Sequence, residues 1–192
     1  MKRYISVTLF TGMRQGEVLG ITWDCIDFER GTILIEKQLQ KNKEANTYGL
    51  VSIKNDKARK ITPAPSVMQR LKGQRARQAG AQLLSRGAWH NPDGLVFTNE
   101  QGRHLVSYTV YKNLKRIVRE LGLDDMRFHD LRHSYAVNAL QSGDDLKSVQ
   151  EALGHHAAAF TLDVYGHVSD TMKKQSAERM ERFIQGIKPC KG

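Results

Sequence analysis

Cysteine is scarce in this chain of 192 residues, where only Cys25 and Cys190 occur. They lie far apart and lack the spacing of metal ligands, which argues against a disulfide framework or a zinc site and favours a reducing, intracellular setting. Proline occurs four times, and no low-complexity tract is present. No apolar run approaches the roughly 20 residues that a membrane-spanning helix needs. These absences argue for a soluble globular protein of ordinary composition.

Acidic residues are also few, with 20 Asp and Glu against 30 Lys and Arg, a net charge of +10. Such an excess suits a polyanionic partner, either nucleic acid or an anionic membrane surface. A basic surface without a specialised partner is the alternative, and charge alone does not decide. Two predicted helices carry basic faces of the kind that are usually solvated. These faces comprise Arg70, Lys72, Arg75 and Arg77 in one helix and Lys112, Lys115, Arg116 and Arg119 in the other.

Apolar periodicity and turn residues predict a mainly helical chain with one small sheet. Helices are expected at 4–10, 14–21, 65–84, 108–121, 129–142, 146–153, 160–168 and 171–187, with Ser107 as an N-cap. Strand-like segments at 32–36, 50–54 and 58–62 predict a three-stranded antiparallel sheet near the N-terminus, and 95–106 another short β segment. The last two strands are expected to form a hairpin across 55–57, with Lys54 at its tip. The fold class is therefore α+β, in a single domain over 1–192.

The stretch HDLRHSYAVNAL (129–140) raises a question about one arginine. On a helical wheel Arg132 falls among the apolar positions, with His129 and His133 beside it. Burying an unpaired guanidinium is very costly, so an inward-facing arginine needs a partner. The sequence around Arg132 does not supply one.

Further cations and a tyrosine follow predicted breaks in the chain: Arg14 after the break at 11–12, Lys54 at the hairpin tip, His155 after a helix end, and Tyr165 ten residues later. Two arginines, a lysine and imidazoles would repel one another without an anion among them. Phosphate fits, because planar guanidiniums grip its oxygens in pairs. A tyrosine beside such a cluster is a candidate nucleophile.

Five segments resemble, in the same order along the chain, the conserved motifs of tyrosine recombinases, which form the phage integrase family. These segments are TGMRQGEVLGITWDCID, the Lys54 hairpin, HDLRHSYA, LGHH and TLDVYGHV. The resemblance covers almost the whole chain and is nearest to the integrases of conjugative transposons and temperate phages. Any single piece is weak, whereas the ordered set is highly specific. It implies the catalytic core of an integrase as the fold and site-specific DNA recombination as the function.

The resemblance implies a catalytic site of six residues: Arg14, Lys54, His129, Arg132, His155 and Tyr165. Tyr165 would attack a DNA phosphodiester and leave a 3′-phosphotyrosine and a free 5′-hydroxyl, with no metal or other cofactor. The two arginines would hold the non-bridging oxygens, and Lys54 would protonate the leaving oxygen. His129 would act in proton transfer at the tyrosine, and His155 would donate a hydrogen bond to the phosphate. The partner of Arg132 would then arrive with the DNA.

Several of these assignments have rivals. Arg14 can pair with Glu17, one helical turn on, while Lys57 and Lys60 share the predicted hairpin with Lys54. His156 competes with His155 for the histidine of the LGHH box. Candidates for contacts to the DNA backbone are Lys57, Lys112, Lys115 and Arg116.

Members of the family usually carry a core-binding domain and often an arm-binding domain, which we expect to be absent because the chain starts just before the TGMR box. Double-stranded DNA is the expected partner, bound by a monomer that assembles into a tetramer. The helix at 171–187 would then pack on a neighbouring protomer, and the location would be the prokaryotic cytoplasm, at the nucleoid. Two other functions remain open: a recombination-incompetent DNA-binding fragment and a type IB topoisomerase-like enzyme.

Overall fold

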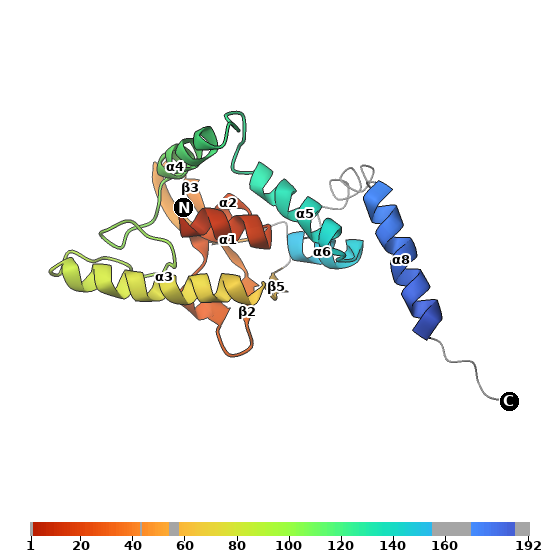
Figure 1. Cartoon of the computed structure of the whole chain (residues 1–192). Coiled ribbons are helices and arrows are strands. Elements are labelled where there is room, and N and C mark those ends of the chain that lie inside the picture. The colour runs from red at the N-terminus through yellow and green to blue at the C-terminus, as the bar shows by residue number, and fades with distance from the viewer. Residues whose placement is uncertain (1, 43, 54–57, 155–169, 187–192) are drawn as a thin grey trace.

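The protein is mainly helical, with small antiparallel sheets in its N-terminal third (Figure 1). The computed structural model describes residues 2–42, 44–53, 58–154 and 170–186. The helices are α1 (Arg3–Thr11), α2 (Gln15–Gly20), the 3-10 turn η1 (Trp23–Cys25), α3 (Pro65–Leu84), α4 (Ser107–Glu120), α5 (Asp130–Ser142), α6 (Leu146–Leu153) and α8 (Asp170–Gly186). The strands are β1 (Ile26–Asp27), β2 (Thr32–Ile35), β3 (Lys37–Asn42), β4 (Thr47–Ser52) and β5 (Arg59–Ile61). The expected α+β class is confirmed.

A three-stranded antiparallel sheet has the order β1-β2-β5, with Ile33 opposite Ile61. The expected hairpin between 50–54 and 58–62 is wrong, because β4 pairs with β3 in a separate two-stranded sheet. β4 pairs with β3 because a turn joins these two strands, where the sequence predicts a loop. The side chain of Asn42 accepts hydrogen bonds from the backbone N–H groups of Glu44 and Ala45, and Asn46 takes a φ of 52°. Such a turn folds the chain back locally. Lys54 and 55–57 lie outside the described residues.

Two hydrophobic clusters form the interior. The main cluster joins α1, α2, the three-stranded sheet, α3 and α4, and its fully buried side chains include Val7, Ile33 and Leu71. A smaller cluster lies between α5 and α6, around Ala136 and Leu153. α5 packs against α1 and against α6 (Figure 1). The protein therefore has a main body and a two-helix unit that adjoin at one end of α1.

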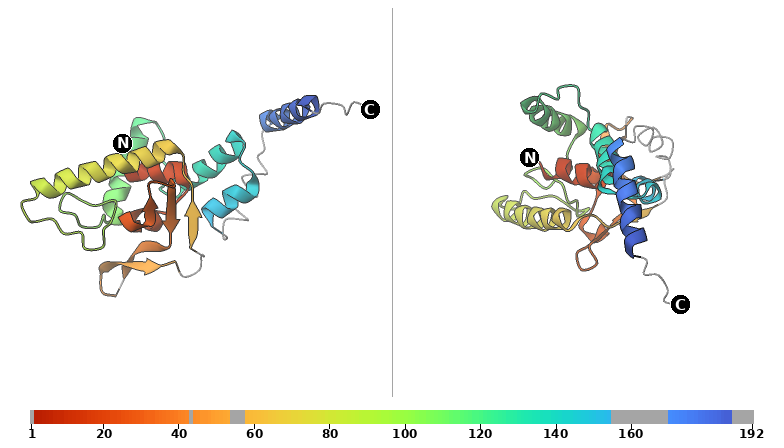
Figure 2. Two further views of the ribbon diagram at one scale, coloured as in Figure 1. Left: turned by 90° about the horizontal axis from the view of Figure 1, so that it is seen from below. Right: turned by 45° about the vertical axis from the view of Figure 1, so that its right-hand side comes forward.

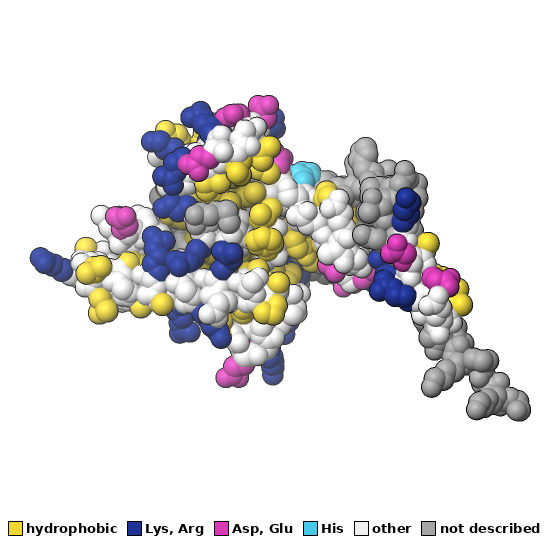
Figure 3. All heavy atoms as spheres, in the orientation of Figure 1, with side chains coloured by type: hydrophobic (Ala, Val, Ile, Leu, Met, Phe, Trp, Pro, Cys, Tyr) yellow, Lys and Arg dark blue, Asp and Glu magenta, His cyan; other side chains and the backbone are white. Residues whose placement is uncertain are grey.

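The long helices follow their sequence signals closely. α3 begins at Pro65, which suits the first helical position because it has no N–H to lose. Its basic face is exposed, and basic side chains are prominent over α3 and α4 in Figure 3. The expected N-cap at Ser107 is wrong, since the cap is Val106 and Ser107 is already helical. The segment 95–106 forms only isolated bridges to Thr22 and within itself.

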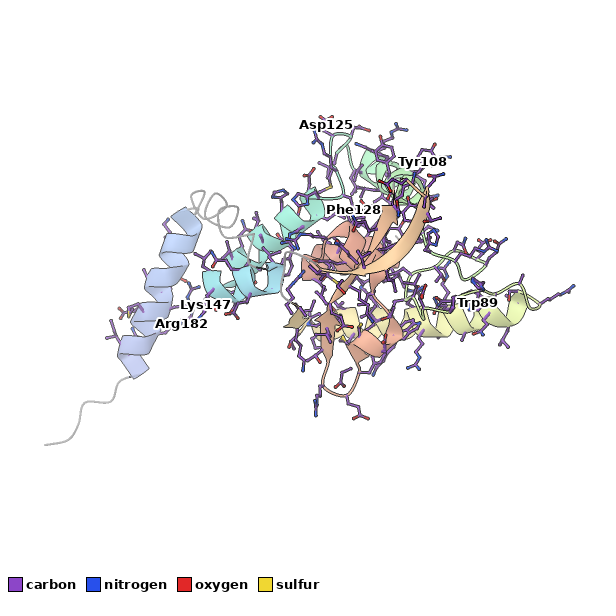
Figure 4. All side chains as sticks on the ribbon, turned by 180° about the vertical axis from the view of Figure 1, so that it is seen from behind. Trp89, Tyr108, Asp125, Phe128, Lys147 and Arg182 are labelled. Atoms are coloured by element: carbon purple, nitrogen blue, oxygen red, sulfur yellow. The ribbon has the colours of Figure 1, made fainter. Side chains whose placement is uncertain are left out.

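α8 extends away from the other described elements (Figure 2, left). It carries Arg182 at the opposite end of the molecule from Trp89, which lies near the end of α3 (Figure 4). Its Met180 and Ile184 side chains are 60% and 54% exposed. None of the helices in the described part of the chain combines the length and the apolar composition that crossing a membrane requires.

Gly12 ends α1 in a left-handed conformation with φ 66°, its N–H donating to the Thr8 carbonyl at 2.9 Å. A Cβ at this position would lie 2.5 Å from the Tyr135 ring and 2.6 Å from the Leu153 side chain. The absence of a side chain therefore lets α5 and α6 approach the end of α1.

Gly12→Ala should cost more stability than Gly31→Ala, a matched control with φ 67° and nothing within 4 Å of its added Cβ. The control should lose about 1 kcal/mol from backbone strain alone. Overpacking should bring the loss at Gly12 to about 3 kcal/mol. Urea unfolding of both variants measures the difference, and equal losses would show that the close approach is unimportant.

Candidate active site at the junction of the two clusters

Arg132 is buried in α5, with 4% of its surface exposed. Its Nη1 donates to the Gly12 carbonyl at 2.7 Å, and its Nη2 donates to the Leu153 carbonyl at 2.5 Å. The inward orientation is confirmed, but the expectation that its partner comes only with the DNA is wrong. Backbone carbonyls at the ends of α1 and α6 accept hydrogen bonds from this guanidinium, so Arg132 links the main body to the α5–α6 unit.

Glu17 is 1% exposed and lies in the first turn of α2. Its Oε2 accepts from the Arg14 backbone N–H at 2.7 Å, which is half of a capping box, and its Oε1 accepts from Arg14 Nη1 at 3.0 Å. The same oxygens accept from Arg59 Nη1 at 2.9 Å and Nη2 at 2.7 Å. Arg14 does pair with Glu17, but Glu17 is shared with a second arginine.

Arg59 faces inward from β5, with 8% of its side chain exposed. Its Nε donates to the Ala152 carbonyl at 2.8 Å, in the last turn of α6. The hydrogen bonds therefore form a continuous series. Arg132 contacts Gly12 and the end of α6, Arg59 contacts the end of α6 and Glu17, and Glu17 contacts Arg14. We refer to these residues as the arginine network. It ties together five elements of the fold.

The electrostatics of the arginine network favour an ionised Glu17. Burial by itself raises the pKa of this carboxyl, but the hydrogen bond and charge of Arg59, and then those of Arg14, outweigh burial and hold the pKa of Glu17 below its ordinary value. A buried carboxylate is stable here because it accepts three hydrogen bonds from two guanidiniums and a fourth from the backbone N–H of Arg14.

His129 lies at the N-terminus of α5, where it is exposed rather than inward-facing as expected. Its ring meets the His133 ring edge-on, with centroids 4.8 Å apart. Partial burial, then the charges of His133 and Arg132 and more weakly Arg14, lower the pKa of His129, and Asp130 opposes them only in part. A neutral imidazole at pH 7 is able to accept a proton.

The structure thus brings three of the six expected catalytic residues to one region: Arg14, His129 and Arg132. Lys54, His155 and Tyr165 lie outside the described residues, as does Lys57. Of the expected backbone contacts on α4, Lys112 and Arg116 are exposed. Lys115 donates to the Asp124 carbonyl and lies 5.9 Å from the centroid of the Tyr111 ring.

Sequence reasoning missed the role of Arg59 and treated Glu17 only as an alternative partner of Arg14. A signal was present at both positions. Arg59 shares a strand face with the buried Ile61, and Glu17 adjoins the buried Val18 and Leu19. Two opposite charges on buried faces of different elements indicate an internal ion pair. No group of three or more potential metal ligands occurs among the residues that the structure describes.

Glu17→Gln should destabilise the folded chain by about 3 kcal/mol at pH 7, because it leaves the buried Arg59 without its countercharge. The folded pKa of Glu17 lies below the ordinary value of about 4.3, so the carboxylate stabilises the fold above that value. This contribution is lost as the pH falls through the folded pKa.

Unfolding free energies measured from pH 7 to pH 3 should therefore converge for the wild type and Glu17→Gln at the acid end. The exposed Glu29→Gln serves as the control and should stay within about 0.5 kcal/mol of the wild type. A difference between wild type and Glu17→Gln that is the same at every pH would contradict this assignment.

Comparison with known proteins gives concordant results. The family model described as the phage integrase family matches residues 1–172. A XerC-like tyrosine recombinase of Caldanaerobacter subterraneus subsp. tengcongensis is 29% identical over 94% of this chain and 49% of its own length. The ICEBs1 integrase of Bacillus subtilis is 27% identical over 95% of this chain and 49% of its own length. The chain thus spans about half the length of these relatives.

Solved structures show the same fold. The Tn1549 transposon integrase in complex with transposon right end DNA superimposes with a TM-score of 0.74 at 22% identity, covering 93% of this chain and 58% of that one. The XerH site-specific recombinase bound to palindromic difH substrate, in a post-cleavage complex, superimposes with a TM-score of 0.58 at 28% identity, covering 93% of this chain and 45% of that one. The match of the family model over most of the sequence, on this fold, means that the chain belongs to the phage integrase family of tyrosine recombinases.

Proposed function

We propose that the chain is the catalytic domain of a site-specific DNA recombinase, which cleaves and rejoins DNA strands through a 3′-phosphotyrosine. The observation that carries the proposal is the arginine network, which holds Arg14 and Arg132 at one place beside His129. Two guanidiniums next to an imidazole form a site that suits a phosphodiester. Membership of the family supports the same chemistry.

In the proposed reaction the Tyr165 phenol oxygen forms a bond to the scissile phosphorus as the bond from phosphorus to the 5′-oxygen breaks. The phenol proton passes to His129, whose lowered pKa favours the neutral imidazole that can accept it. Lys54 donates a proton to the leaving 5′-oxygen. The 5′-hydroxyl of another strand then attacks the phosphotyrosine, which regenerates the phenol and rejoins the backbone. The phosphotyrosine link conserves the free energy of the broken phosphodiester bond, so the exchange needs no metal and no nucleotide cofactor.

Arg14 and Arg132 would bind the non-bridging oxygens and stabilise the charge that builds up on pentacoordinate phosphorus, with His155 as a further donor. Donors that are fixed before the reaction commonly contribute about 3 kcal/mol each to lowering a barrier. The arginine network provides such preorganisation, because hydrogen bonds within the protein already hold both side chains. Binding energy is then not needed to collect them around the phosphate.

Double-stranded DNA is the partner that we propose. The net charge of +10 and the exposed basic residues of α3 and α4 suit a polyanion (Figure 3). The Tn1549 integrase and XerH have been solved with DNA. Lys57, Lys112, Lys115 and Arg116 are the proposed backbone contacts, which would position the duplex without reading its sequence. The proposed location is the prokaryotic cytoplasm.

We also propose that the domain covers 1–192, that the free protein is a monomer and that it assembles as a tetramer on DNA, with α8 docked on a neighbouring protomer. Support comes from the exposed Met180 and Ile184 on a helix that extends away from the other described elements (Figure 1). Apolar side chains in this arrangement suit burial against a second surface.

A nicked suicide substrate tests the proposed chemistry. The short fragment beyond the nick diffuses away after cleavage, so the phosphotyrosine accumulates as an adduct that survives SDS. Duplexes randomised around the nick serve as the pool, because the sequence of the protein does not determine the target site. The wild type should form the adduct. Tyr165→Phe should lower the adduct yield at least 1,000-fold, which corresponds to about 4 kcal/mol in activation free energy.

Tyr108→Phe, which changes an exposed tyrosine on α4, is the control and should retain wild-type yield. If the wild type forms no adduct, the chain is a DNA-binding fragment without cleavage activity. A plasmid carrying two copies of the recovered site separates the remaining alternatives. Relaxed circles without recombinants would indicate a topoisomerase.

Ile184→Glu should block assembly on DNA while leaving the binding of one protomer intact, because a charge on the proposed docking face opposes its burial. Native gels of the recovered duplex should lose the complexes that hold more than one protomer. Gln185→Glu adds the same charge at an adjacent exposed residue and should assemble normally. An Ile184→Glu protein that assembles like the wild type would disprove the docking of α8.

A further inference from the structure

We infer that Arg59 is a positioning residue, which holds Arg14 and Arg132 in the arrangement that the proposed cleavage requires. The inference rests on the proposed function. Arg59 itself contacts the Glu17 carboxylate and the Ala152 carbonyl. It therefore acts through its neighbours, not on the phosphate.

The contacts of Arg59 use the shape of a guanidinium. Nε donates to the end of α6, and Nη1 and Nη2 donate to separate oxygens of Glu17. All three bonds are between 2.7 and 2.9 Å and lie in a side chain that is 8% exposed. A lysine has the charge but only one nitrogen, so it is unable to hold both partners at these positions.

Arg59 also determines how strongly Glu17 holds Arg14. Each Glu17 oxygen accepts one hydrogen bond from Arg14 and one from Arg59. If Arg59 were removed, both oxygens would be left to Arg14, and the carboxylate would attract its guanidinium more strongly. Sharing with Arg59 therefore favours an Arg14 that can also bind a phosphate.

The position of the arginine network gives these contacts their importance. Glu17 and Arg59 come from the main body, whereas Arg132 and the end of α6 belong to the α5–α6 unit. The hydrophobic effect is non-directional. The hydrogen bonds at this junction are directional and add a constraint on how the two units meet, and a displacement of about 1 Å in an active site can cost a factor of about 100 in rate.

The test compares Arg59→Ala and Arg59→Lys with Arg30→Ala, which removes an exposed arginine outside the arginine network. Single-turnover adduct formation is measured over a range of concentrations of the recovered nicked duplex. Both Arg59 variants should lower the maximal rate at least tenfold and change the half-saturating DNA concentration less than threefold. Arg30→Ala should keep the maximal rate.

Chemical rescue separates positioning from general loss of structure. Methylguanidinium should restore part of the Arg59→Ala rate, because it fits the space left by the side chain, whereas methylammonium at equal concentration should not. All rates are taken at a temperature at which circular dichroism shows a folded protein. If Arg59→Ala does not fold, Arg59→Lys, which keeps the charge, decides the outcome by its maximal rate.

A wild-type maximal rate in either folded Arg59 variant would overturn the inference. It would also be overturned if the half-saturating DNA concentration rose by the same factor as the maximal rate fell. A rate loss in Arg59→Ala that methylguanidinium does not restore would overturn it as well. Failure of the proposed function gives a different result, since wild type and Arg30→Ala would then also form no adduct. In that case the inference is tested by the NMR chemical shifts of the arginine Nε–H groups. Resonances of Arg14 and Arg132 that are unchanged in Arg59→Lys would overturn it.

Discussion

The rest of the site depends on the interaction of the buried Glu17 carboxylate with two arginines. It is shared by Arg14 and Arg59, and through Arg59 it is connected to the end of α6 and to Arg132. An ion pair in the protein interior is a poor source of stability when compared with apolar packing, but removing one partner is costly. Such a network suits a site whose geometry, more than its stability, must be maintained.

The fold supports this constraint in two ways. The glycine at position 12 brings α5 and α6 against the end of α1, where a Cβ would collide with Tyr135 and Leu153. The same residue offers its carbonyl to Arg132. One backbone position therefore contributes both to the packing of the two clusters and to the hydrogen bonds across their junction. Arg14 follows two residues later, so the turn that closes the packing also delivers a candidate phosphate ligand.

Local signals made parts of the fold predictable from the sequence. Pro65 marks the start of α3, and Gly143 marks the end of α5. The pairing of β4 was not predictable in this way, because 47–49 read as loop and the Asn42 turn was not recognised. Arg14, His129 and Arg132 were identified through the resemblance to a family, whereas periodicity alone did no more than place Arg132 on an apolar face.

Arg59 shows what sequence reasoning lacked. Its partner Glu17 is 42 residues away, and its other partner is a backbone carbonyl 93 residues away. Hydropathy patterns describe which face of an element is buried, but they do not say which buried charges meet. Recognition of such a pair requires the packing of β5 against α2 and α6, which only the tertiary structure provides.

The central claim is that Arg14 and Arg132 act on one DNA phosphate. It is tested most directly by cleavage of a nicked duplex whose scissile phosphate is replaced by an uncharged methylphosphonate. Because each protein is compared on two substrates, differences in its folded fraction cancel. The loss of rate caused by Arg132→Ala, and by Arg14→Ala, should be at least tenfold smaller on the uncharged substrate. Equal losses on both substrates would show that neither guanidinium neutralises the phosphate.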